Sequence, residues 1–185
     1  GGIRNTDDIS ERLVVGADKV TLNTAAVKKP ELITDAAKQF GSQCIVVSID
    51  VSLKDDGSYE VMVDGGSRAT NLSPVDWAKD VEQLGAGEIF LNSVDRDGSG
   101  LGYDLGLIRS VVQNVRIPVI ACGGVGRYDQ IASGILEGKA SAVAAGNIFH
   151  FFELSYPHAK QACINAGIPM RPVGLGSRYK TREPD

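Results

Sequence analysis

Residues 44–50 read Cys-Ile-Val-Val-Ser-Ile-Asp, and this stretch decides the fold class. Its apolar residues fall on both alternating faces, as expected of a parallel strand that helices cover. Helical patterns stand before it, at residues 31–40, and after it, at residues 74–84. Pro30 suits the first turn of the earlier helix. A strand between two such helices predicts an α/β chain with a parallel sheet.

The alternation of strand and helix continues along the chain. Helices are expected at residues 7–15, 31–40, 74–84, 105–114, 128–136 and 156–166, and strands at 20–23, 44–50, 89–92, 118–121 and 140–145. The helices are long enough to be crossover connections, so about five parallel strands are expected. Residues 52–69 interrupt this order. There the run 58–63, followed by Asp64-Gly65-Gly66, predicts an inserted β-hairpin.

Composition narrows the classes of protein. The 185 residues are 43% hydrophobic and 23% charged, which is typical of one globular domain. The net charge is −4 and the basic residues are scattered, which argues against a nucleic-acid surface. Neither a membrane span nor a signal peptide is evident, so a cytoplasmic location is expected. Free thiols are expected at Cys44, Cys122 and Cys163, and no metal site is expected around His150 or His158.

Glycine and small polar residues gather where the predicted strands end. Gly123-Gly124-Val125-Gly126 precedes a helix, and Ala145-Gly146-Asn147 opens another. Backbone N–H groups of such turns can bind a phosphate, although a tight turn that needs positive φ is an alternative. Gly1-Gly2 and Asn23-Thr24 form an analogous pair. Two phosphate sites on opposite sides of the edge where the parallel strands end would suit a substrate that carries a phosphate at each end.

Two carboxylates are candidates for acid–base chemistry. Asp50 ends an apolar strand, where a carboxylate is costly unless it faces the mouth of the sheet. We favour a general base there over a helix cap or a salt bridge to the hairpin. Asp97 lies in Val94-Asp95-Arg96-Asp97-Gly98 and is the second candidate. An Asp95–Arg96 pair in the same loop could be purely structural.

Several strings of the sequence together resemble one known family. They are GGIR (1–4), ADKVTLNTAAV (17–27), ELITDAAKQFGSQCIVVSID (31–50), WAKDVEQLGAGEI (77–89), SVDRDGSGLGYDL (93–105), IPVIACGGVG (117–126) and IFHF (148–151). The chain is similar, to about residue 170, to the cyclase subunit of imidazole glycerol phosphate synthase, a (β/α)8 TIM barrel of histidine biosynthesis. The resemblance implies an α/β partial barrel over residues 1–170, which would include the hairpin predicted above at about 52–69. Residues 171–185 are rich in charge, Gly and Pro, so a flexible C-terminal tail is expected there.

The resemblance also implies an activity. The family closes an imidazole ring with ammonia from a glutaminase partner. It converts a bis-phosphorylated ribulosyl aminoimidazole nucleotide into imidazole glycerol phosphate and an aminoimidazole carboxamide nucleotide, and no cofactor is expected. The residues that match the family's motifs would be catalytic at Asp50 and Asp97, phosphate-binding at Gly2, Asn23 and Thr24 and at Gly98, Gly124, Ala145 and Gly146, an ammonia gate at Lys19 and Glu88, and the glutaminase interface at Asp18 and Gln43.

Departures from the family leave alternatives open. A whole barrel needs about 250 residues, so this chain would cover about five C-terminal βα units and lack the other catalytic Asp, on the family's first strand. Gly146-Asn147 stands where the family has a serine. A second hypothesis is a paralogue paired with an amidotransferase in amidino-sugar and surface-polysaccharide synthesis. A third is a catalytically incomplete fragment that self-associates through exposed sheet edges. A barrel isomerase of the same pathway is a weaker alternative.

Overall fold

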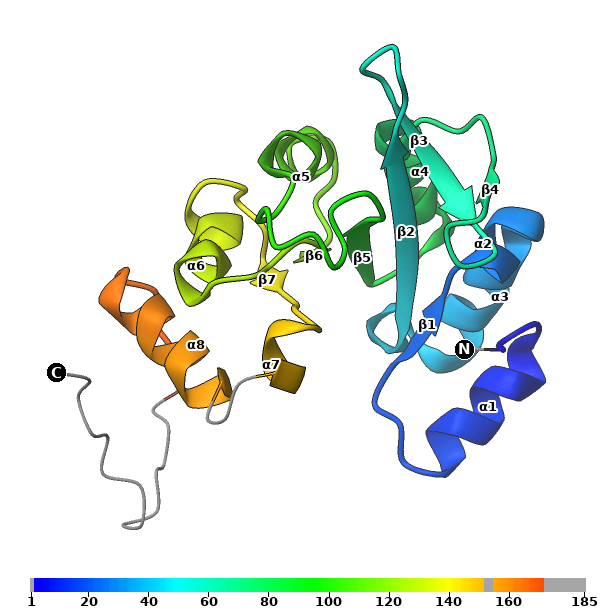
Figure 1. Ribbon diagram of the computed structural model, residues 1–185. Coiled ribbons are helices and arrows are strands. Elements are labelled where there is room, and N and C mark those ends of the chain that lie inside the picture. The colour runs from blue at the N-terminus through cyan, green and yellow to red at the C-terminus, as the bar shows by residue number, and fades with distance from the viewer. Residues whose placement is uncertain (1, 152–154, 172–185) are drawn as a thin grey trace, which may run out of the picture.

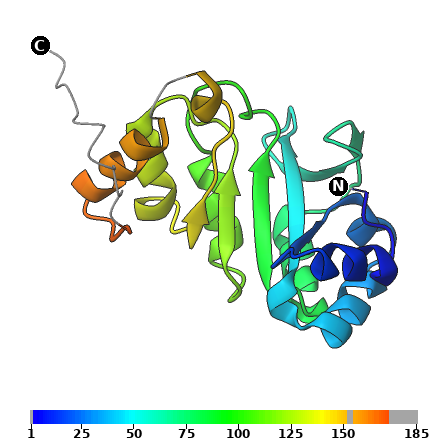
Figure 2. The ribbon, with the colours of Figure 1, turned by 90° about the horizontal axis from the view of Figure 1, so that it is seen from below.

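The computed structural model describes residues 2–151 and 155–171, and a sheet of parallel strands forms its centre. The parallel strands follow one another in the order β1-β2-β5-β6-β7, as the colours from blue to yellow show in Figures 1 and 2. Their bounds are β1 Val20–Leu22, β2 Ile45–Leu53, β5 Glu88–Ser93, β6 Val119–Cys122 and β7 Ala142–Val143. The α/β class and the parallel pairing predicted from residues 44–50 are therefore confirmed.

Helices connect these strands. They are α1 Thr6–Val14, α2 Thr24–Lys28, α3 Glu31–Phe40, α4 Pro74–Leu84, α5 Leu105–Val112, α6 Tyr128–Leu136, α7 Ile148–Phe151 and α8 Ser155–Asn165, with a 3-10 turn, η1, at Ser42–Cys44. Local capping explains the sharp bounds of α4. Ser73 accepts a hydrogen bond from the Asp76 N–H at its start, and Gly85 ends it in the left-handed conformation at φ 103°. No helix in the described part of the chain is long and apolar enough to cross a membrane.

The two faces of the sheet differ in their surroundings. Side chains such as Ile49, Leu91 and Ala121 point to the helix-covered face and are almost fully buried. Residues of alternate register, such as Asp50, Asn92 and Cys122, are only half-buried. Helices thus cover the face of residues 44–50 that carries Ile49, while Ser48 and Asp50 on the other face are half-buried. The less covered face carries the polar groups that form the candidate site.

An antiparallel extension follows the parallel part of β2. Asp50 does not end its strand, because β2 continues to Leu53 and pairs with β3, Tyr59–Val63, which in turn pairs with β4, Arg68–Ala69. The β2–β3 turn projects beyond the rest of the molecule in Figure 1. The second turn is tight, since Asp64, Gly65 and Gly66 all have positive φ, at 55°, 71° and 80°. The predicted tail at 171–185 lies, except for Arg171, outside the described residues.

A partly buried tyrosine, Tyr59, ties this extension to the helical layer. The Tyr59 hydroxyl donates to Asp104 Oδ2 at 2.8 Å, while Asp104 Oδ1 caps α5 by accepting from the Leu107 N–H at 3.0 Å. Burial, followed by the neighbouring Asp104 carboxylate, raises the pKa of Tyr59 to about 12. One carboxylate thus fixes both the start of α5 and the base of β3.

Tyr59→Phe should therefore destabilise the chain by about 1–3 kcal/mol, because it removes a hydrogen bond to a charged acceptor. Urea unfolding at neutral pH measures this loss. Since the folded-state pKa of Tyr59 is raised, its stabilising contribution is present below pH 10 and is lost as the pH rises through about 12. Tyr156→Phe is the matched control, because Tyr156 is 59% exposed. Equal stability of the two variants would contradict the role assigned to Tyr59.

Candidate functional site

Asp50 lies at the centre of a polar network on the less covered face of the sheet. Asn23 Nδ2 donates to Asp50 Oδ2 at 3.1 Å, and Ser48 Oγ donates to Asp50 Oδ1 at 3.3 Å. Asn92 Nδ2 approaches Asp50 Oδ1 at 3.5 Å, and Asn92 is the residue beside Asp50 in the β2–β5 register. The network therefore joins three adjacent strands, β1, β2 and β5.

Burial is the main cause of an elevated pKa at Asp50. The hydrogen bonds from Asn92, Ser48 and Asn23 oppose this rise, and the charge of Asp97 adds to it. Burial also raises the pKa of the Cys122 thiol, which senses the charges of both Asp97 and Asp50. The charge of Asp97 thus acts on Asp50, and both carboxylates disfavour the thiolate form of Cys122. A half-buried carboxylate with a raised pKa is a common feature of acid–base sites.

Asp95 and Asp97, in the first part of the β5–α5 loop, have different surroundings. Asp95 accepts from Ser52 Oγ at 2.9 Å and from the Leu53 N–H at 2.6 Å, so it fastens the loop to β2. Asp95 thus has a structural role, as predicted, but its partners are residues of β2 and not Arg96. Asp97 is exposed, and no hydrogen bond of its side chain is found among the described residues. Its carboxylate is available to a ligand.

A cavity of about 590 Å³ lies at the first predicted phosphate site. Gly2, Asn23 and Thr24 all line it, so the structure brings together residues from the start of the chain and from the end of β1. The cavity also carries the cations Arg4, Lys28 and Lys29, together with one carboxylate, Asp64. A concave surface with three cations beside small polar residues is suited to an anion.

The loops of the second predicted phosphate site pack directly on one another. The Gly102 N–H donates to the Gly124 carbonyl at 2.7 Å, and a Cβ atom added at Gly126 would lie 2.7 Å from Gly100 Cα. A Cβ atom at Gly98 would lie 3.3 Å from Asn147 Nδ2, which brings in the loop after β7. Ala145 and Gly146 belong to this last loop, and Gly146 is exposed with open space around it. The loops that follow β5, β6 and β7 therefore adjoin one another.

Known proteins match this chain closely. The sequence model of a family described as histidine biosynthesis protein matches residues 1–155. Imidazole glycerol phosphate synthase subunit HisF of Alkaliphilus metalliredigens (strain QYMF) is 50% identical over 171 residues, which are 92% of this chain and 68% of that relative. The chain belongs to the histidine biosynthesis family, with the cyclase subunits of imidazole glycerol phosphate synthase. The predicted resemblance, TIM-barrel family and enzyme class are thereby confirmed.

The opposite end of the sheet in this HisF-family chain carries the predicted ammonia gate and partner residues. Lys19 Nζ forms an ion pair with Glu88, and the two residues come at the starts of β1 and β5. Val20 pairs with Ile45, so Asp18 and Gln43 precede neighbouring strand starts, and both are exposed. The structure therefore groups these four residues at the amino ends of the parallel strands, which we call the floor of the sheet, away from Asp50.

Sequence reasoning missed one residue that organises the second glycine cluster. Gln130 Oε1 accepts from the Gly126 and Arg127 N–H groups at 2.9 and 3.0 Å, while its Nε2 donates to the Gly100 carbonyl at 3.2 Å. Glutamine three residues after a helix N-cap is a known capping signal, which could have indicated the first two bonds. Within residues 2–151 and 155–171, no three His, Cys, Asp or Glu side chains are grouped as metal ligands would be.

Proposed function

We propose that this chain carries out the cyclase reaction of its family. It would use ammonia to convert a bis-phosphorylated ribulosyl aminoimidazole nucleotide into imidazole glycerol phosphate and an aminoimidazole carboxamide nucleotide. The observation that carries the proposal is the placement of Asp50. A half-buried carboxylate with a raised pKa lies on β2, with the cationic cavity at the end of β1 on one side of it and the glycine cluster of the β5, β6 and β7 ends on the other.

This placement suits ring closure with ammonia. Closing the ring requires protons to leave the nitrogen and to reach the departing group, so an acid–base group must lie between the two anchored ends of the substrate. Asp50 is the proposed proton acceptor, and the exposed Asp97 is the proposed auxiliary group. Asn23 and Asn92, which hydrogen bond to Asp50, would hold its carboxylate in a fixed orientation.

Two anchors would hold the substrate across Asp50. We assign one phosphate to the cavity of Gly2, Asn23 and Thr24, where Arg4 and Lys28 supply positive charge. We assign the other to the cluster of Gly98, Gly124, Ala145 and Gly146. There backbone N–H groups at the start of α6, a helix of nine residues, supply partial positive charge. The spacing of the anchors would then select substrates with two phosphates.

We propose that ammonia enters from the floor. A glutaminase partner would dock on exposed groups that include Asp18 and Gln43, and the Lys19–Glu88 pair would form part of a gate beneath the site.

Self-association remains a separate proposal. Within the described residues β1 pairs only with β2, and β7 pairs only with β6, so each strand leaves one edge unpaired.

The test is ammonia-dependent turnover of the ribulosyl nucleotide. The chain spans 68% of the length of its HisF relative, so it is assayed alone and together with a peptide that carries the part of that relative outside the match. Product formation in either sample supports the cyclase proposal, and glutamine plus glutaminase should replace the ammonium salt. A folded sample without turnover in both assays would refute the proposal and favour the sugar-pathway paralogue or the catalytically incomplete fragment.

A further inference from the structure

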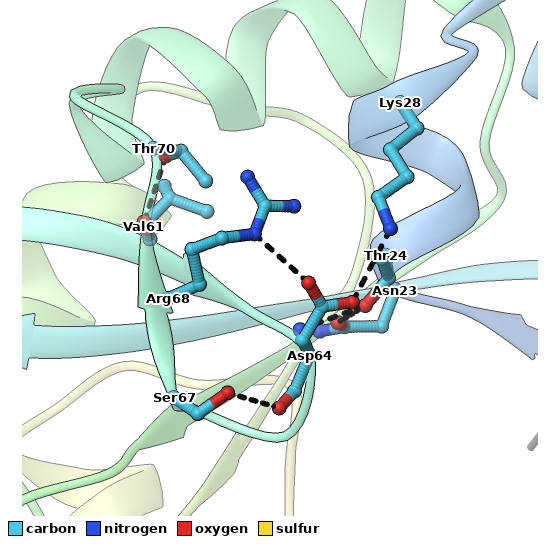
Figure 3. Close-up of polar contacts among 8 residues, drawn as sticks. All are labelled: Asn23, Thr24, Lys28, Val61, Asp64, Ser67, Arg68 and Thr70. Carbon is cyan, nitrogen blue, oxygen red and sulfur yellow. Dashed lines mark hydrogen bonds and ion pairs between the residues drawn. The ribbon is translucent and has the colours of Figure 1, made fainter.

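The cationic cavity already contains an anion of its own. Asp64, in the turn between β3 and β4, lines the cavity together with Arg4, Lys28 and Lys29. Its Oδ1 lies 3.4 Å from Lys28 Nζ, and its Oδ2 accepts from Arg68 Nε at 2.9 Å. Figure 3 shows the lysine and the arginine approaching the carboxylate from two sides. A carboxylate in this position opposes the binding of any second anion.

The turn also engages the cavity through its backbone. The Asp64 N–H donates to Thr24 Oγ1 at 2.9 Å, and the Thr24 hydroxyl in turn donates to Asn23 Oδ1 at 3.1 Å. A threonine hydroxyl has only one hydrogen to donate. A phosphate that takes the Thr24 hydrogen must therefore replace Asn23. A phosphate that binds Lys28 competes with the Asp64 carboxylate for the same positive charge.

These competing contacts are weak enough to exchange. The side chains of Lys28, Arg68 and Asp64 are 59%, 52% and 40% exposed, and ion pairs between exposed groups contribute little. Arg68 and then Lys28 lower the pKa of Asp64, which is therefore ionised at neutral pH. The turn has no helix or strand hydrogen bonds at its tip, so it can move without disturbing the sheet.

We propose that Asp64 is a specificity-determining residue of this cavity, a built-in competitor that holds Lys28 until a phosphate group displaces it. The turn of residues 64–67 then shifts as Lys28 passes from the carboxylate to the ligand. This inference rests on the phosphate site proposed above. It adds that the affinity of the site is set by a carboxylate outside the glycine and Asn-Thr motifs, and that the site favours a ligand charged enough to displace it.

The test is a titration of the protein with inorganic phosphate, followed through the NMR amide signals of Thr24, Gly65 and Gly66. Asp64→Asn keeps the shape and tolerates the positive φ of this position, so it removes only the charge. The variant should bind phosphate about two- to fivefold more tightly than the wild type, the range expected for loss of one exposed ion pair. Binding to the wild type should shift the Gly65 and Gly66 signals, and the shift should be smaller in Asp64→Asn.

Two further variants isolate the contact. Lys28→Met retains most of the side-chain stem, and in that background Asp64→Asn should have a much smaller effect. Asp129→Asn removes another exposed ion pair, with Arg127, outside this cavity and should leave the affinity at Thr24 unchanged. Equal or weaker binding by Asp64→Asn, with clear shifts at Thr24, would overturn the competitor role alone. No shift at Thr24 in any variant would overturn the phosphate site and the competitor role together.

Discussion

Replacing Asp50 with Asn should lower the kcat of ammonia-dependent turnover by about 10²- to 10⁴-fold, the usual contribution of a positioned general base. Asn is nearly the same size as Asp and can still accept a hydrogen bond from Asn23, so the change removes proton transfer with little loss of shape. Substrate affinity should change little, because Asp50 belongs to neither proposed phosphate anchor. Steady-state kinetics with an ammonium salt measures both parameters.

The pH profile gives an independent check on Asp50. Burial raises its pKa above the ordinary value of 3.8, and a base must be ionised, so turnover should rise with pH through the raised value. The effect on stability has the opposite sign. Because folding favours the protonated form, the contribution of Asp50 is fully present below pH 3.8 and is lost as the pH rises through the folded-state pKa.

Asp56→Asn is the matched control for Asp50→Asn. Asp56 lies in the exposed β2–β3 turn, where it accepts from the Ser58 N–H at 2.9 Å. This variant should keep turnover close to that of the wild type. A folded Asp50→Asn variant with a kcat within threefold of the control would show that Asp50 is not the proton acceptor, and attention would then pass to Asp97.

The elements that the sequence predicts best are those with local signals. Three helices have the predicted bounds, because their apolar residues recur with helical periodicity; they lie at residues 31–40, 74–84 and 128–136. The short helix α2 was not predicted. It spans only Thr24–Lys28, too few residues for a periodic pattern, and Ala26 is buried in the core. The strand predicted at residues 140–145 is reduced to Ala142–Val143, since only these residues pair with β6.

In the candidate site, too, the sequence indicates single residues but not the long-range contacts between them. Asp50 and the glycines stand out because a carboxylate and successive glycines are unusual within or directly after an apolar run. The bonds that organise the site join residues far apart in sequence, such as Asn23 to Asp50 and Asp95 to Leu53. No local pattern encodes such a pair, because the fold must first bring the strands together.

Gly124→Ala should have the largest structural effect at the second phosphate site. Gly124 has φ 100°, and an added Cβ atom would overlap the Gly102 carbonyl oxygen and lie 3.0 Å from Arg96 Cβ. The clash is with backbone, so the two loops must separate. We expect a loss of roughly 2 to 4 kcal/mol in the free energy of unfolding, from positive φ in a non-glycine residue and from overpacking.

Gly146→Ala separates this packing effect from phosphate binding itself. Gly146 belongs to the same proposed site, yet nothing lies within 4 Å of an added Cβ atom and its φ is not in the left-handed region. Denaturant unfolding should therefore distinguish the two variants, with Gly146→Ala within about 1 kcal/mol of the wild type. If Gly124→Ala is equally stable, the loop contact through Gly102 is not needed by the fold. Gly124 would then be explained by close approach of a ligand to its backbone.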